Sequence, residues 1–120
     1  MTIDEFARLI DASLCHLPSH RERDIRRFSA ADTMSSLIAQ ARPDSVLVPS
    51  LNNLQVARVA ELMDVPAICL VGGAAPCDAL ITCADAAGIA VLVTGGDLAL
   101  TKRKLSAVMG DCPRGASFSR

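Results

Sequence analysis

One unit, an apolar run followed by a turn and a helical segment, occurs three times in succession between residues 44 and 109. The apolar runs are residues 45–48, 67–71 and 89–93. Each run is continuously apolar instead of alternating with polar residues, which is typical of strands covered on both faces of a parallel sheet. The repetition therefore predicts a three-layer α/β fold, with a mostly parallel sheet built from repeated βα units.

Helical periodicity and end signals follow each apolar run. The first helix is expected from about Asn52 to Met63, where apolar residues recur every three or four positions. The second is expected to begin with Pro76 as its first helical residue and to end at Gly88. The third runs from about residue 97 to 109. Each connection is too long for a hairpin, so right-handed crossovers are expected.

Residues 1–43 predict an N-terminal helix and a lead-in to the repeats. Thr2 and Glu5 form a capping-box pattern for a helix that reaches Asp11. Its buried side is expected to consist of Phe6, Leu9 and Ile10.

The rest of the lead-in predicts a short strand around residues 25–28 and a helix over 33–41 that is capped by Asp32. Together with the repeats this makes residues 1–109 a single domain. Residues 110–120 are rich in Gly, Pro, Ser and Arg, and we expect them to form a flexible tail.

Composition excludes several classes of partner. The net charge of −1 and the aromatic content of 2% leave neither a basic field for phosphates nor rings for base stacking, which excludes nucleic acid. No apolar run approaches the roughly 20 residues that span a bilayer, and the N-terminus lacks a signal-peptide pattern, so we expect a cytoplasmic protein. Apolar residues make up 51% of the chain, which is an excess that a homodimer would bury.

A ligand site is expected at the carboxyl ends of the predicted strands, where parallel sheets bind ligands. Helix N-termini and paired glycines there offer backbone N–H groups to a small anion or a nucleotide phosphate. The alternative is that these residue types are simply what tight strand-to-helix turns require. The candidate ligand-binding residues are Asp32, Ser50, Asn52, Asn53, Gly72, Gly73, Thr94, Gly95 and Gly96.

No catalytic residue, metal site or cofactor is predicted. The sequence contains neither the GxxxxGK[ST] phosphate loop nor the GxGxxG dinucleotide pattern. His16 and His20 have a spacing that a helix could use to hold a metal, but Pro18 lies between them, so solvated loop histidines are favoured. The charged segment 20–27 mixes both signs and indicates a solvated face or a partner contact.

The five cysteines are an odd number without CxxC spacing, which predicts reduced thiols. Cys69 lies within an apolar run and is expected to act as a small hydrophobic residue. Cys77, expected in the first turn of a helix, is either a redox-sensitive thiol stabilised by the helix dipole or an ordinary first-turn residue.

Over roughly residues 29–99 the chain resembles the DRTGG domain family, and within it the short stand-alone members labelled as HPr-kinase-like. The element Ala-Asp-Thr-Met-Ser at residues 31–35 is the most specific carrier of this resemblance. The other carriers are the segments 49–56, 71–73 with Pro76, and 87–92, together with Arg58, Ala60 and Glu61.

The resemblance implies a fold like that of the N-terminal domain of HPr kinase/phosphorylase and of MurF-like domains. It also implies a regulatory, dimer-forming unit that does no chemistry, and for stand-alone relatives a sensor or assembly role beside hydrogenase or complex-I-like redox enzymes. One departure stands out: Asn52-Asn53 occupies the place of the Asp-Arg pair, although Gly72-Gly73 keeps the glycine pair. Loss of the arginine removes a bidentate contact for an anion.

Three functions are therefore expected, in decreasing order of support. The first is a non-catalytic regulatory domain that senses a small anionic or nucleotide ligand and acts as a homodimer. The second is a protein-interaction module for a redox enzyme or a kinase. The third is a small enzyme using Asp32, Ser50 or Cys77, for which no nucleophile–base pair can be assembled from the sequence.

Overall fold

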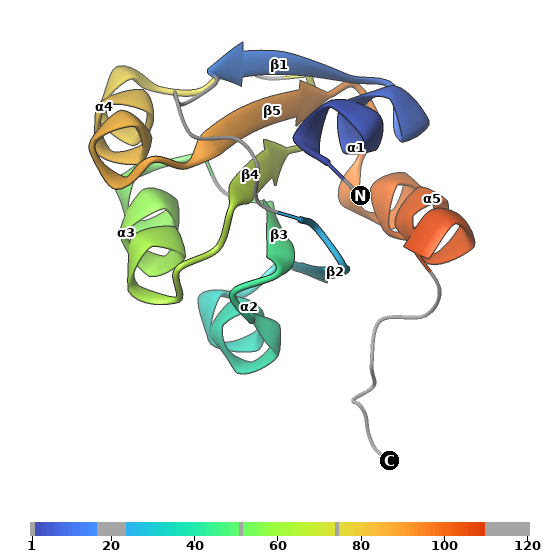
Figure 1. Ribbon diagram of the computed structural model, residues 1–120, viewed down its shortest axis with the longest axis horizontal. Helices are drawn as coiled ribbons and strands as arrows, with labels where there is room; N and C mark the ends of the chain where they lie inside the picture. Colours follow the sequence, from blue (N-terminus) through green and yellow to red (C-terminus); the bar gives the residue numbers. More distant parts are fainter. Residues whose placement is uncertain (1, 17–23, 51, 74, 110–120) are drawn as a thin grey trace.

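A computed structural model of the chain describes residues 2–16, 24–50, 52–73, 75–109 (Figure 1). The tail 110–120, His20 and the first part of the charged segment 20–27 lie outside the described residues. The described part contains, in chain order, α1 (Ile3–Leu9), β1 (Ala12–His16), β2 (Arg27–Ala31), α2 (Met34–Gln40), β3 (Ser45–Pro49), α3 (Leu54–Leu62), β4 (Ala67–Leu70), α4 (Asp78–Ala87), β5 (Ala90–Thr94) and α5 (Leu98–Met109).

The strands form one five-stranded sheet in the order β1-β5-β4-β3-β2. β2, β3, β4 and β5 run parallel to their neighbours, whereas β1 pairs antiparallel with β5. The predicted α/β fold with a mostly parallel sheet and alternating βα units is therefore confirmed. None of the described helices has the combination of length and apolar character needed to cross a membrane.

Helices cover both faces of the sheet, which explains why the strands are apolar throughout. On one face Leu47, Ile68 and Val91 belong to a buried cluster that includes residues of α2, α3 and α4. On the other face their chain neighbours, such as Val46 and Leu92, join a second cluster with residues of α1 and α5. Figure 1 shows these two helical layers on either side of the sheet. Successive side chains of one strand thus enter two different cores.

The first strand was not predicted from the sequence. β1 follows α1 after one turn, in which Asp11 has the left-handed φ of 56°. Its central residues Ser13, Leu14 and Cys15 are exposed, and the pairing register shifts between Leu14 and His16. A short, exposed and irregular edge strand carries little periodic signal, because packing determines most of what makes a strand recognisable.

The strand predicted around residues 25–28 is present as β2, but it begins at Arg27 and ends at Ala31. Ile25 is buried but precedes the strand, whose register pairs Arg27 with Ser45 and Ala31 with Pro49. The extent of β2 is therefore determined by its pairing with β3. In the described part of the charged segment, Asp24, Arg26 and Arg27 are exposed; Arg27 Nε lies 3.5 Å from Asp44 Oδ2.

The capping box of α1 is confirmed, but one of the three residues predicted to be buried is exposed. Thr2 Oγ1 accepts from the backbone N–H of Glu5, and Glu5 Oε1 accepts from the N–H of Thr2. Phe6 and Ile10 are buried as predicted, whereas Leu9 is 52% exposed. Ile3 takes its place, because Ile3 and Phe6 lie one turn apart on the face toward the sheet.

Two predicted helix starts are also corrected. Thr33, not Asp32, caps α2, with its hydroxyl accepting from the N–H of Ser36 at 3.3 Å. Pro76 is not the first helical residue of α4, since Cys77 is the N-cap and the helix begins at Asp78. At the other end the prediction is confirmed, because Gly88 ends α4 in the left-handed conformation with φ 73°.

We predict that Gly88→Ala lowers the free energy of unfolding by about 1–2 kcal/mol. An added Cβ meets nothing within 4 Å, so the loss comes from the positive φ alone. Chemical denaturation measures it. Gly95→Ala is the matched control, because Gly95 has equally open surroundings without a positive φ. An equal loss in both variants would contradict the conformational explanation.

Candidate functional site

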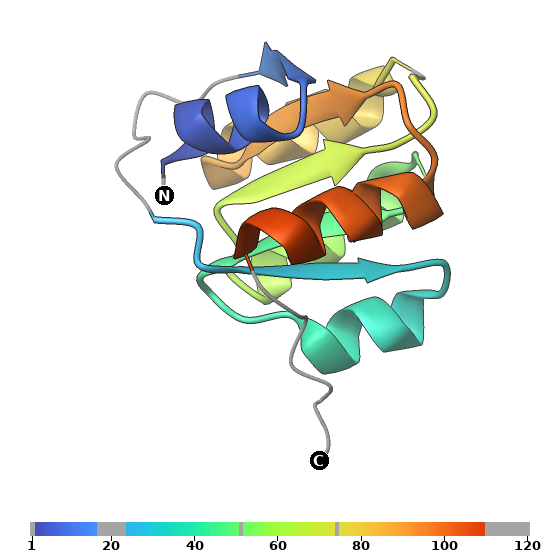
Figure 2. The same ribbon diagram turned by 90° about the vertical axis from the view of Figure 1, so that its right-hand side faces the viewer.

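The turns after β3, β4 and β5 lie together at the carboxyl-terminal edge of the sheet, as the sequence predicted for parallel strands (Figure 2). Hydrogen bonds join each turn to another part of this edge. The turn after β3 contacts the turn after β4, and the turn after β4 contacts the turn after β5. The candidate ligand-binding residues are thus gathered in one region.

Asn52 joins the first two turns through its side-chain amide. Its Nδ2 donates to the carbonyl of Ala75 at 2.7 Å, and its Oδ1 accepts from the backbone N–H of Cys77 at 3.1 Å. One amide thus satisfies both a carbonyl and an N–H just before α4, in the way that Asn side chains imitate backbone in turns.

The glycine pair after β4 joins the last two turns. Gly72 and Gly73 both have positive φ, of 78° and 72°, a conformation that residues with a Cβ rarely adopt. The N–H of Gly72 donates to the carbonyl of Gly96 at 2.8 Å, and that of Gly73 to the carbonyl of Thr94 at 2.9 Å. These two N–H groups are therefore bound within the protein.

The remaining polar candidates also have internal roles. Asn53 caps α3 by accepting from the N–H groups of Gln55 at 3.0 Å and Val56 at 3.4 Å. Thr94 is buried at the end of β5, and the neighbouring Asp97, which was not a candidate, accepts from the N–H of Leu100 at 2.8 Å. Ser50 Oγ donates to the carbonyl of Asp32 at 3.4 Å. These bonds support the turn-forming interpretation of the polar residues, while their contact with a ligand stays a prediction.

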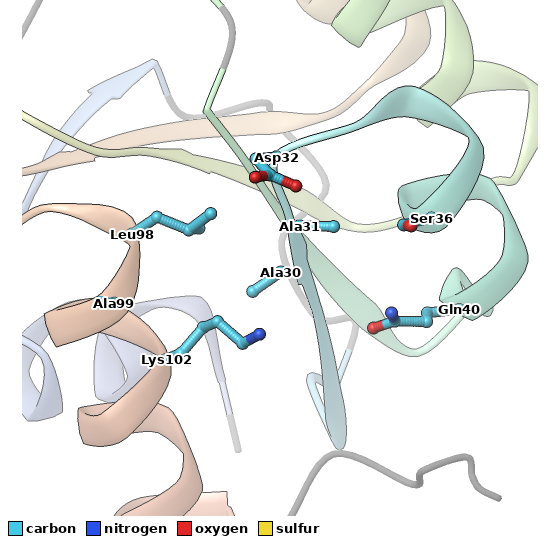
Figure 3. A pocket seen from close by; sticks show the side chains of 8 residues that line it. All are labelled: Ala30, Ala31, Asp32, Ser36, Gln40, Leu98, Ala99 and Lys102. Carbon is cyan, nitrogen blue, oxygen red and sulfur yellow. The ribbon is translucent and has the colours of Figure 1, made fainter.

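A groove of about 460 Å³ lies beside this edge, between α2 and α5 along the second half of β2 (Figure 3). Alanines at 30, 31 and 99 leave the space open because they have no side chain beyond Cβ. Among the predicted site residues, Asp32 lines the groove. The full lining is Ala30, Ala31, Asp32, Ser36, Gln40, Leu98, Ala99 and Lys102.

Charges of both signs line the groove. Lys102 extends from α5 on one wall toward the floor, while Asp32 lies at the end of β2 (Figure 3). Within the described part of the chain, neither of these exposed side chains forms an ion pair. Ser36 and Gln40 of α2 provide a hydroxyl and an amide on the opposite wall. Lys102 was missed by sequence reasoning, because nothing local indicates which strand α5 covers.

His16, expected in a solvated loop, instead ends β1 and lies against α4. Its Nε2 is 3.2 Å from Oδ1 of Asp85, which is an ion pair when the imidazole is protonated. The angles do not make this contact a hydrogen bond, so the buried Nε2 has no hydrogen-bond partner among the described residues. In the described ranges no three His, Cys, Asp or Glu side chains are placed to hold a metal ion.

The described cysteines are free thiols in different surroundings. Cys69 is buried in the centre of the sheet, as predicted, and burial raises the pKa of its thiol to about 12. Cys77 is half-buried at the N-cap of α4 and its side chain makes no capping hydrogen bond.

Substitution of Asn52 by Ala is expected to lower the free energy of unfolding by about 1 kcal/mol, because two hydrogen bonds between the turns are lost. Urea denaturation measures the change. Ser50→Ala serves as the control, since its one bond is long at 3.4 Å. We expect that control to change stability by less than about 0.5 kcal/mol; a larger loss than in Asn52→Ala would contradict this account of the edge.

Alkaline destabilisation is expected to depend on Cys69. The unfolded chain releases the thiol proton near the ordinary pKa of 9.0, whereas the folded chain keeps it up to about 12. Stability from this group is therefore complete below pH 9 and is lost as the pH rises toward 12, with a slope of at most about 1.4 kcal/mol per pH unit. We expect Cys69→Val to lose less stability than the wild type between about pH 8 and pH 10.5 in urea titrations. Identical losses would show that the thiol is not the group responsible.

Comparison with known proteins shows a similarity of fold. No protein-family model matches this chain, and no curated protein sequence does. A solved structure does match: the CBS and DRTGG domains of the regulatory region of Clostridium perfringens pyrophosphatase, complexed with the activator diadenosine tetraphosphate. The TM-score is 0.63 at 15% sequence identity, over 87% of this chain.

The class defined by the fold is thus an α/β domain similar to a CBS/DRTGG regulatory region. At 15% identity the similarity shows a shared fold and no more. The chain matches 45% of the length of the pyrophosphatase region, which contains two kinds of domain.

Proposed function

We propose that this protein is a DRTGG-type regulatory domain that carries out no chemistry, binds a small anionic or nucleotide ligand, and acts as a homodimer. Support comes from the fold shared with a regulatory region that is complexed with a nucleotide activator. The residues that carry the sequence resemblance support the same assignment. The observation that carries the ligand proposal is the groove lined by both Lys102 and Asp32.

The groove has the size and lining of a small-molecule site. Its volume of about 460 Å³ lies within the usual range for ligand pockets, and its walls combine apolar surface with a few polar groups. Lys102 offers a cation to a phosphate, while the Asp32 carboxylate accepts hydrogen bonds from hydroxyl groups. A free phosphate would gain only the first contact and would be repelled by Asp32. A nucleotide carries both a phosphate and ribose hydroxyls, so it uses both contacts.

The absence of chemistry is proposed from the side chains available. Catalysis by a nucleophile needs a base within hydrogen-bonding reach and a group that orients the base. Among the described residues, no hydrogen bond joins the Cys77 thiol to a base, and His16 contacts Asp85 in the last turn of α4, at the opposite end of that helix from Cys77. Asp32 and Ser50 meet through the Asp32 carbonyl, not through its carboxylate.

A second candidate function is a protein-interaction module that docks a redox enzyme or a kinase. It is favoured by the internal bonds of Asn52, Asn53, Gly72 and Gly73, which leave the strand-end turns with few groups for a ligand. Affinity purification from the native cell separates the two functions. A stable protein partner favours docking, while ligand sensing predicts stabilisation by a small molecule without one.

The ligand proposal predicts that AMP, ADP or ATP raises the melting temperature. Ligand at a hundredfold excess over its dissociation constant adds about 2.7 kcal/mol to the free energy of unfolding. Lys102→Gln is expected to weaken nucleotide binding by roughly tenfold, since a charge-assisted contact is lost. Arg103→Gln is the matched control, because it removes the same charge from an exposed neighbour that does not line the groove.

Each outcome of the thermal-shift series either supports or contradicts nucleotide binding in the groove. Stabilisation by nucleotides that depends on Lys102 but not on Arg103 supports the groove. Equal effects of the two variants would contradict it, and inorganic phosphate acting as well as the nucleotides would contradict the role of Asp32. No stabilisation by any of these compounds at millimolar concentration would overturn ligand sensing in favour of the docking function.

A further inference from the structure

The two edge strands of the sheet differ in how far their side chains are buried. At the β2 edge, only Arg27 is exposed and the next four residues are buried, with α2 and α5 on either side (Figure 2). At the β1 edge, Ser13, Leu14 and Cys15 are all exposed, and Leu14 is 36% exposed. β1 contains no acidic residue, lysine, arginine or proline. Monomeric proteins usually place such residues on a sheet edge to prevent pairing with another chain.

We propose that β1 pairs antiparallel with β1 of a second copy of this chain, so that two sheets join into one. This rests on the homodimer part of the proposed function and assigns the surface that forms it. Pairing ends at two copies, because both copies use the same edge and that edge is occupied once they have joined. The contact is therefore a closed two-fold interface and not the start of a filament.

The geometry of β1 restricts the register of this pairing. The bulge after Leu14 and the left-handed Asp11 interrupt regular strand conformation on either side, so the regular stretch is 12–14. A two-fold axis perpendicular to the sheet requires opposed residues to share a face. The centre of the stretch therefore lies at Ser13, which faces its own copy. Ala12 then lies opposite Leu14 of the second copy, which makes two apolar cross-strand pairs.

The same axis brings the two α1 helices together in a complementary way. Leu14 pairs with Leu92, whose cluster includes Phe6 of α1, so Leu14 and α1 share one face of the sheet. The exposed surface of α1 has Glu5 toward its beginning and Arg8 and Leu9 at its end. These three residues line a shallow hollow of about 290 Å³.

Antiparallel packing of α1 on its copy matches opposite charges. The acidic first turn of each helix, with Asp4 and Glu5, faces the Arg8 end of the other helix. The exposed Leu9 side chains add apolar surface at the same contact. A surface that carries both charge signs in this order is complementary to itself under a two-fold rotation, which favours a second copy over an unrelated strand.

Sedimentation velocity over a concentration series tests the interface. We expect the wild type to form a dimer, and Leu14→Lys to raise the dimer dissociation constant on the order of ten- to a hundredfold, because it places two lysines in the new sheet. Leu62→Lys is the matched control, since Leu62 is a 78% exposed leucine on α3, outside this surface. Circular dichroism verifies that each variant is folded.

A covalent trap tests the register without weakening the interface. In a Cys15→Ser background, Ser13→Cys is expected to give a disulfide between the two copies on mild oxidation, in which two thiols lose two protons and two electrons to the oxidant. The Cys15→Ser protein that keeps Ser13 is its control. A monomeric wild type, a dimer insensitive to Leu14→Lys, or no cross-link in the Ser13→Cys variant would each overturn the proposal. Sedimentation needs no ligand, so this failure is distinguishable from a failure of ligand sensing in the thermal-shift series.

Discussion

The central strands are buried on both faces of the sheet, and the positions of the helices and of the candidate site follow from this. Along β3, β4 and β5 successive side chains enter two different cores, so each strand needs apolar residues throughout and helices on both sides. With almost no aromatic residues, the layers are filled by Ala, Val, Leu and Ile, in which Ala57, Ala60 and Ala84 let helices approach the sheet closely. The parallel order of these strands then brings their carboxyl ends to one edge.

At that edge the same residue types have to close turns and, in the proposed function, to leave room for a ligand. Asn52, Asn53 and the glycine pair are used for hydrogen bonds between and within the turns. A groove opens instead where the lead-in strand β2 ends, because three alanines line its floor and one wall. This arrangement separates the hydrogen-bonded turns from the space in which Lys102 and Asp32 are available. It suits the proposed sensing role, since occupancy of the groove would tie α2 and α5 to the same strand.

The two edge strands of the sheet, β1 and β2, have different surroundings. The side chains of β2 after Arg27 are buried, and the groove lies along this strand between α2 and α5, whereas the central residues of β1 at the opposite edge are exposed. The proposed ligand site and the proposed dimer interface therefore lie at opposite edges of one five-stranded sheet. On one face of this sheet, Leu105 of α5 and Phe6 of α1 belong to the same buried cluster, which connects the two regions.

The repeated strand–helix units, the capping box of Thr2 and Glu5, and the helix end at Gly88 could all be predicted from the sequence, because they depend on residues close together in the chain. The sequence also placed the candidate residues at one sheet edge, since parallel strands must end together. The strand β1 could not be predicted in this way, since its pairing with β5 joins residues 12–16 to the distant residues 91–94. The exposure of Leu9 and the direction of Lys102, which points toward β2 beside Ala30, could not be predicted either, because both follow from which surface a helix packs against. Contacts between distant parts of the chain leave no periodic trace in either part, and so the groove could not be predicted from the sequence.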